Sequence, residues 1–236
     1  GLVPDLKDDL ETAAEKLSNQ WLTNYRVQIK SLSDERQDVY RQIREMSADP
    51  LDVDLARPNT WLQMTTARKA DGTEEALPRF ERHMLCDEDG LFPGDFNSWE
   101  GKVVKAELER NGTVAWYRNP ARASQDSLGV TYEEGGDIKI VRPDFIFFAQ
   151  LDDGTVVADI VDPHGIQFGD ALPKLKGLAE YAEANAGTYR RIEVVAEVGG
   201  TFRTIDLTEA SARAAVKSAA TVKEVYDSEV AHDYVM

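Results

Sequence analysis

The chain has 236 residues, of which 42% are hydrophobic and 30% are charged, so it can bury a core and is not disordered throughout. Its formal net charge of −16 argues against a protein whose whole surface follows nucleic acid, but leaves room for a locally basic groove. The single cysteine, Cys86, excludes an intramolecular disulfide and a four-cysteine zinc site, and no apolar run reaches membrane-spanning length. We therefore expect a cytoplasmic protein with a reduced thiol and no membrane partner.

Residues 5–47 contain no glycine or proline and predict a long amphipathic helix, with apolar residues at steps of three or four. The pattern ends at Asp49-Pro50. Unbroken, this helix would extend for about 60 Å at 1.5 Å per residue, and Ser31-Leu32-Ser33-Asp34 is the one stretch suited to a break. We treat residues 1–50 as a helical extension. It either packs on its own domain or acts as a strut to an upstream domain, and the sequence leaves both open.

Short strands and turns are expected over residues 51–96, a β-rich connecting region. Strands are predicted at Thr60–Thr66 and Phe80–Leu85, with a turn at Ala70–Thr73 between them.

A helix is predicted at residues 97–111, capped by Asn97 or Ser98, and a strand follows it. The loop after this strand contains Arg118 and Arg122, a reasonable cradle for phosphate groups. Alternatively, Arg118 pairs with one of the many acidic residues of this chain.

A buried β-hairpin is predicted next, because two apolar runs of strand length flank the turn Asp152-Asp153-Gly154. If these residues form a three-residue loop, Gly154 supplies the left-handed conformation that such a loop needs.

The hairpin register brings two carboxylates together. Leu151 pairs with Thr155, and counting back along both strands places Asp144 opposite Asp162. His164 projects from the same face as Asp162, whereas Asp159 points to the opposite face.

Two carboxylates at the end of buried strands repel each other, which raises both pKa values unless a cation lies between them. Mg²⁺ is held by one or two carboxylates and completed by water or phosphate oxygens. Asp144 and Asp162 therefore predict a metal-dependent phosphodiester site.

These motifs resemble a known family. Pro143-Asp144, the hairpin and Asp162-Pro163-His164 are similar to the PD-(D/E)xK nuclease signature, with His164 where the family has a lysine. More narrowly, Trp116–Pro120 and the two motif strands resemble the C-terminal region of DEAD/DEAH-box helicases related to type III restriction subunits. The resemblance covers about Phe80 to Val198.

Beyond the hairpin, the pattern predicts a helix at Asp170–Ala186, a strand at Arg191–Val198 and a last helix from Thr208 to about Val225. The hydroxyl of Thr208 is well placed to cap that last helix.

The resemblance implies further site residues and partners. It implies Mg²⁺ or Mn²⁺ as the cofactor, and Glu100 as an acidic contribution from the first core helix, although a first-turn carboxylate also suits the helix dipole. It also implies that Lys174 or Lys176 replaces the missing lysine, since in some nucleases of this family the lysine lies on the following helix. DNA is the implied substrate. A helicase motor is implied in the same longer chain, which begins here with Gly1 and not with Met.

We thus expect an α/β fold, in which helices flank a mixed central sheet with a restriction-endonuclease-like αβββαβ core at residues 97–206, followed by a C-terminal helix at 207–236. Two function classes remain: a metal-dependent nuclease in which His164 orients or deprotonates water, and an inactive pseudonuclease module that binds DNA or a partner. A third interpretation is a structural Asp/His turn without a site.

Overall fold

The computed structural model describes residues 64–235 except 122–126 and 168, together with single positions between residues 13 and 40. The chain divides into two compact units, Gly1–Asp54 and Leu55–Met236, and every element discussed below belongs to the second. The helix predicted over residues 5–47 falls mostly outside the described residues, so both it and its strut role stay predictions. Arg122 also lies outside the described residues.

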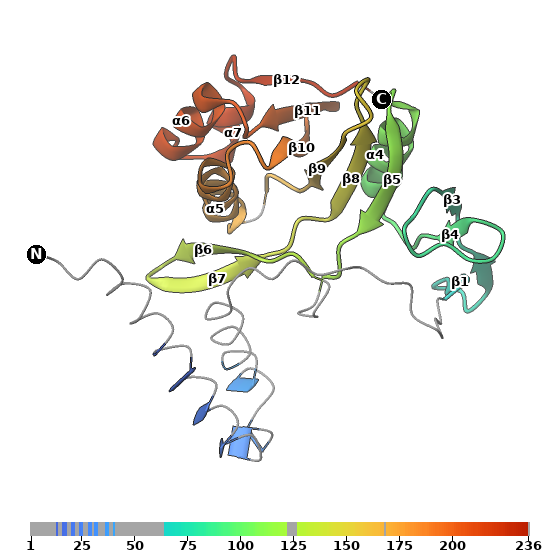
Figure 1. Ribbon diagram of the computed structural model, residues 1–236, viewed down its shortest axis with the longest axis horizontal. Helices are drawn as coiled ribbons and strands as arrows, with labels where there is room; N and C mark the ends of the chain where they lie inside the picture. The colour runs from blue at the N-terminus through green and yellow to red at the C-terminus, as the bar shows by residue number, and fades with distance from the viewer. Residues whose placement is uncertain are drawn as a thin grey trace, which may run out of the picture. The chain divides into compact units, whose positions relative to one another are not determined.

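A mixed sheet forms the centre of the second unit, with the strand order β12-β11-β10-β9-β8-β5 (Figure 1). Strands β5, β8 and β9 form an antiparallel meander, β9 and β10 run parallel, and β10, β11 and β12 are again antiparallel. The bounds are β5 (Thr113–Arg118), β8 (Phe145–Gln150), β9 (Val156–Pro163), β10 (Tyr189–Val198), β11 (Thr201–Asp206) and β12 (Ala231–Asp233).

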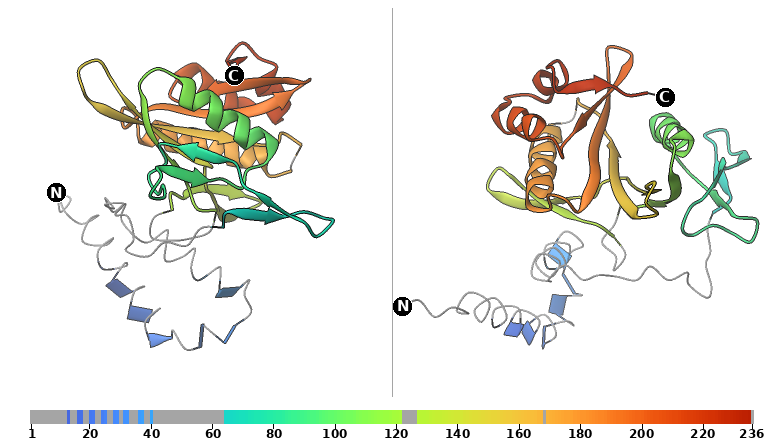
Figure 2. Two further views of the ribbon diagram at one scale, coloured as in Figure 1. Left: turned by 90° about the vertical axis from the view of Figure 1, so that its right-hand side faces the viewer. Right: turned by 45° about the horizontal axis from the view of Figure 1, so that its top comes forward.

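Helices cover both faces of this sheet (Figure 2). On one face, Val103 of α4 packs in a core with Phe145 and Phe147. On the other, Leu175 of α5 shares a core with Ile160, and α6 and α7 complete that layer. The helices are α4 (Ser98–Glu109), α5 (Ala171–Ala184), α6 (Ala210–Ser218) and α7 (Val222–Tyr226). Within the described residues, no helix is both long enough and apolar enough to cross a membrane.

The central hairpin has the predicted register. Ile146 pairs with Ile160 and Phe145 with Val161, as counting back from the turn requires. Gly154 has a φ of 86°, the left-handed conformation expected of it. Both strands are covered by helices, which explains why their sequences are apolar on both faces.

In the part of the chain that the structure describes, three small hairpins lie outside the central sheet: β1–β2 (Thr66–Arg68 and Glu74–Ala76), β3–β4 (Arg79–Glu81 and Leu91–Pro93) and β6–β7 (Val130–Glu134 and Asp137–Val141). The β6–β7 hairpin is absent from the sequence predictions, although Gly135-Gly136 between two alternating runs is a typical hairpin signal. Its strand β6 lies very close to α5. A Cβ added at Gly177 would come within 2.4 Å of Tyr132 Cβ, so this approach requires glycine.

Two sequence predictions need correction. The helix predicted from Thr208 to Val225 is wrong, because α6 and α7 are separate helices. The N–H and hydroxyl of Thr208 both donate to Asp206 Oδ1, so this residue closes a turn instead of capping a helix. Thr221 caps the second helix by accepting from the N–H of Glu224.

The early strands also differ from the predicted ranges, of which residues 60–63 lie outside the described residues. Within the described residues, β1 begins only at Thr66, at the end of the predicted range. The strand predicted at Phe80–Leu85 ends at Glu81, because Arg82 has a φ of 63° and leaves the extended conformation.

Candidate active site

Asp144 and Asp162 meet at one end of the central hairpin. Asp144 directly precedes β8, and Asp162 is the second-last residue of β9. The backbone N–H of Asp144 donates to Asp162 Oδ1 over 2.9 Å. The structure therefore brings together the two carboxylates that the hairpin register predicts.

Both of these carboxyl groups hold their protons more tightly than usual. Burial raises the pKa of Asp144 to about 7, and the neighbouring charge of Asp162 adds to this effect, whereas Arg118 opposes it. Burial also raises the pKa of Asp162, against the opposing influence of His164 and of the N–H of Asp144. The positive charge of the residues around Asp144 and Asp162 therefore does not offset the burial of these two carboxyl groups.

Arg118 lies between two carboxylates at the end of β5. Its Nη2 donates to Glu100 Oε1 over 2.7 Å, and its Nη1 lies 2.9 Å from Asp144 Oδ1. Its guanidinium also lies over the rings of Phe145 and Phe96, with distances of 4.6 and 5.6 Å to the ring centroids. Of the two roles considered for Arg118, the structure places it in the ion pair and not in an open phosphate cradle.

Glu100 has both carboxylate oxygens engaged. Asn97 caps α4 by accepting from the N–H of Glu100, and Glu100 Oε2 accepts from the N–H of Asn97 over 2.8 Å, which completes a capping box. The other oxygen accepts from Arg118. The N-cap prediction is confirmed for Asn97, and the Arg118 guanidinium lies between Glu100 and Asp144, whose pKa the charge of Glu100 also raises.

His164 lies just beyond β9, where its backbone N–H donates to the carbonyl of Val195. Its Nδ1 lies 3.4 Å from the Asp162 carbonyl oxygen and 3.8 Å from Asp162 Oδ2. Burial lowers the pKa of His164, although the charge of Asp162 acts in the opposite direction. Its Nε2 is buried and has no hydrogen-bond partner among the described residues. The imidazole is therefore neutral at pH 7, with one nitrogen unused.

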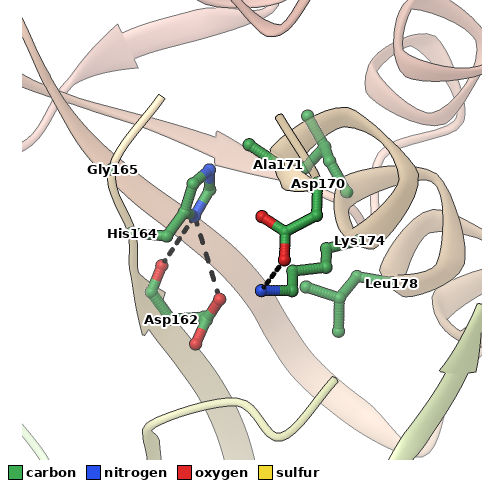
Figure 3. A pocket seen from close by; sticks show the side chains of 8 residues that line it. Asp162, His164, Gly165, Asp170, Ala171, Lys174 and Leu178 are labelled. Atoms are coloured by element: carbon green, nitrogen blue, oxygen red, sulfur yellow. Dashed lines mark hydrogen bonds and ion pairs between the residues drawn. The ribbon is translucent and has the colours of Figure 1, made fainter. Parts of the chain in front are cut away.

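A small pocket of about 50 Å³ joins His164 and Asp162 to the start of α5 (Figure 3). Lys174 lines this pocket, and its Nζ contacts Asp170 Oδ2 over 2.6 Å. The sequence left open which of two lysines is near the site. The structure places Lys174 there, whereas Lys176 lines a separate groove with Glu133 and Glu180.

Sequence reasoning did not assign a site role to Asp170. The signal was present, because Asp170 and Lys174 are four residues apart at the start of a helix, where such pairs meet. Tyr226 was also missed; its ring lies 6.0 Å from that of His164, and its hydroxyl donates to the carbonyl of Val194.

The donor chemistry of the site fits a hard divalent cation. Within the described residues, no three His, Cys, Asp or Glu side chains converge as a metal cluster. Two carboxylates are nevertheless enough for Mg²⁺, which retains several water ligands in most of its protein sites. Asp144 and Asp162 are the residues that would hold it, since their own charges are incompletely neutralised.

A second charged cluster lies on the opposite face of the same strand, where Asp159 points as predicted. Arg191 contacts the carboxylates of Asp159, Glu107 and Glu193 at 2.6 to 2.9 Å. Arg190 also pairs with Asp159, and Arg110 pairs with Glu107. The hydroxyl of Tyr234 donates to Glu107 over 2.6 Å. We call these residues the Arg191 cluster.

Comparisons with known proteins place the chain in a family. No solved structure gives a significant match. The chain is similar to Protein YagJ of Escherichia coli (strain K12), with 49% identity over 235 residues that cover 99% of this chain and 96% of YagJ. A family model described as the YagJ family matches residues 81–235, which include Asp144, Asp162, His164 and Lys174. The chain therefore belongs to the YagJ family.

Proposed function

We propose that this protein is a metal-dependent nuclease that hydrolyses DNA phosphodiesters. The observation that supports this function best is the meeting of Asp144 and Asp162 at the end of the central hairpin, beside a pocket lined by Lys174 and His164. Two carboxylates, an ammonium group and a neutral imidazole are the groups that metal-assisted hydrolysis of a phosphodiester needs.

The arrangement of elements supports the proposal. In chain order α4, β5, β8, β9, α5 and β10 follow the αβββαβ pattern that the PD-(D/E)xK resemblance implies. The strands β5, β8, β9 and β10 are neighbours in the sheet, and α5 connects the parallel pair β9 and β10. We therefore propose a restriction-endonuclease-like core, with β6–β7 inserted between its first two strands.

In this proposal Asp144 and Asp162 hold Mg²⁺ or Mn²⁺, which supplies a Lewis acid and a water of lowered pKa. His164 accepts a proton at Nε2, since burial favours its neutral form. Lys174 provides the fixed positive charge that the family's lysine provides, and it does so better than His164, whose pKa is lowered.

DNA and a helicase motor are the proposed partners. The resemblance supports both, because it extends to the C-terminal region of DEAD/DEAH-box helicases, where the motor is part of the same longer chain.

The direct test is a cleavage assay. Wild type, Asp162→Ala and the turn variant Asp153→Ala would be incubated with Mg²⁺ or Mn²⁺ and with single-stranded, linear and supercoiled DNA. We expect metal-dependent cleavage by wild type and Asp153→Ala, and a loss of at least about 10²-fold in Asp162→Ala. Equal cleavage by all three proteins, or none by any of them, contradicts the nuclease function.

A second candidate is an inactive pseudonuclease module that binds DNA or a partner. The ion pair of Arg118 with Asp144 favours it, because a guanidinium already lies where a ligand of Asp144 would bind. Binding of labelled DNA by wild type in metal-free buffer, without cleavage when Mg²⁺ or Mn²⁺ is added, distinguishes this candidate from the nuclease.

A further inference from the structure

We propose that Arg118, held in place by Glu100, competes with a divalent cation for the carboxylate of Asp144. In the metal-free protein its guanidinium neutralises Asp144, and it releases Asp144 but stays on Glu100 when a divalent cation binds. The inference rests on the proposed function, because it assumes that Asp144 is a metal ligand.

The first support is the position of the guanidinium. Its two terminal nitrogens lie within 3 Å of two different carboxylates, those of Glu100 and Asp144. Asp144 in turn donates its backbone N–H to Asp162, the other proposed ligand. Arg118 therefore supplies positive charge to the same carboxylate that a divalent cation would use, and the two cations exclude each other there.

The second support is that the two contacts of Arg118 are unequal. Nη2 donates a hydrogen bond of 2.7 Å to Glu100, and Nη1 lies 2.9 Å from Asp144 Oδ1. Stacking on Phe145 and Phe96 also holds the guanidinium independently of Asp144. Because Glu100 is fixed by the capping box of α4, the contact with Asp144 is the weaker one and breaks first.

The position of Glu100 makes it the anchor for Arg118. One of its oxygens is bonded to Asn97 and the other to Arg118, so both are engaged by the protein. Removing the charge of Glu100 would leave Arg118 with Asp144 as its remaining carboxylate, and the competition with metal would become stronger. Glu100 thus favours metal binding without touching the metal.

Calorimetric titration with Mn²⁺ tests the proposal on the full chain. We expect Arg118→Gln to bind Mn²⁺ roughly two- to tenfold more tightly than wild type, the range typical of losing one partly exposed ion pair. Arg118→Lys keeps the charge but loses the planar fork and part of the stacking, so its affinity should lie between the two. Arg79→Gln, which removes an exposed ion pair with Asp87, is the matched control and should bind as wild type does.

A double-mutant cycle separates an anchor from a ligand. Glu100→Gln should weaken Mn²⁺ binding in the wild-type background. In the Arg118→Gln background the same change should have a clearly smaller effect, because only the direct charge interaction between Glu100 and Asp144 then remains. If Glu100→Gln weakens binding equally in both backgrounds, Glu100 is itself a metal ligand, and the proposal is wrong.

The remaining outcomes are also decisive. If wild type binds Mn²⁺ and Arg118→Gln binds it equally or more weakly, the competition is refuted while the metal site stands. If neither protein binds Mn²⁺, the proposed function fails and the competition fails with it.

Should Arg118→Gln not fold, Arg118→Lys and the nitrogen NMR signal of the Arg118 side chain in wild type replace it. We expect Mg²⁺ to shift that signal, and an unchanged signal under saturating Mg²⁺ overturns the proposal.

Discussion

The two faces of β9 carry buried carboxylates three residues apart, Asp159 and Asp162, in very different surroundings. Asp159 belongs to the Arg191 cluster, where Arg110, Arg190 and Arg191 meet three carboxylates. At the end of the hairpin, Arg118 pairs with both Glu100 and Asp144, whereas Asp162, on the face opposite Asp159, lies beside the neutral His164 and accepts from the N–H of Asp144.

This difference separates a structural role from a functional one. Asp159 is paired with two guanidinium groups and is therefore satisfied by the protein itself. A buried carboxylate without enough positive charge favours binding of a cation from solution. We therefore expect mutations on the Asp159 face to change stability and those on the Asp162 face to change metal binding and catalysis.

The largest effect is expected at His164. If His164 is a general base, its neutral form is active, and the cleavage rate should rise with pH through its folded pKa, which lies below the ordinary value of 6.5. His164→Ala should lower the rate by about 10²–10⁴-fold, and His164→Lys should flatten the rising limb. A rate that instead falls with rising pH would assign His164 a cationic role, and equal rates for wild type and His164→Ala would leave it without a catalytic role.

Substitution of Arg191 should lower the stability of the protein and leave metal binding unchanged. Arg191→Met leaves Asp159, Glu107 and Glu193 buried with less positive charge, and should lower the free energy of unfolding by about 3–5 kcal/mol in urea melts. The Mn²⁺ affinity of the folded protein should not change. An equal loss of Mn²⁺ binding would show that the two faces are not independent.

Lys174 and Lys176 form a matched pair on one helix. Lys174→Ala should lower the cleavage rate by about 10²–10³-fold, because it removes a preorganised charge from the site. Lys176→Ala should cleave at the wild-type rate, since Lys176 lines a different groove. Similar losses in both variants would indicate general DNA binding in place of a role at the site.

The smallest effect concerns Asp144 without metal. Its pKa is about 7 in the folded protein and about 3.8 ordinarily, so the folded state binds more protons between these values and loses stability as pH rises through them. Asp144→Asn removes this loss and should be more stable than wild type by about 1–2 kcal/mol at pH 8, and not at pH 4. Urea melts in EDTA measure this, with Asp152→Asn, at an exposed position of the same turn, as the control. A variant less stable than wild type at pH 8 would show that Arg118 fully compensates the charge of Asp144.

Much of the centre of the fold could be predicted because it depends on local signals. The turn at Gly154 fixes the hairpin register, and that register alone brings Asp144 to Asp162. The capped helix α4 and the helix α5 are likewise predictable from Asn97 and from an apolar stripe.

The rest depends on contacts between distant segments. From the sequence, Arg118 could bind phosphate groups or pair with an acidic residue. Only the fold shows that Glu100 lies close enough to accept a hydrogen bond from it. The Arg191 cluster joins residues of α4, β9 and β10, and no spacing in the sequence predicts such a meeting. The division of the last helix falls at residues 219–221, where Ala219 ends α6 and the side chain of Thr221 caps α7.

The close approach of α5 to β6 has a consequence for the reach of Lys174. Gly177 lies three residues after Lys174 on the same helix, and its lack of a side chain lets the backbone of Thr131 and Tyr132 lie against that helix. A larger residue at position 177 would push α5 and the hairpin apart, and any tilt of α5 would be transmitted to the ammonium group within a turn of the helix. The β6–β7 hairpin thus fixes the position of α5. The position of the Lys174 ammonium group in the pocket therefore depends partly on Gly177.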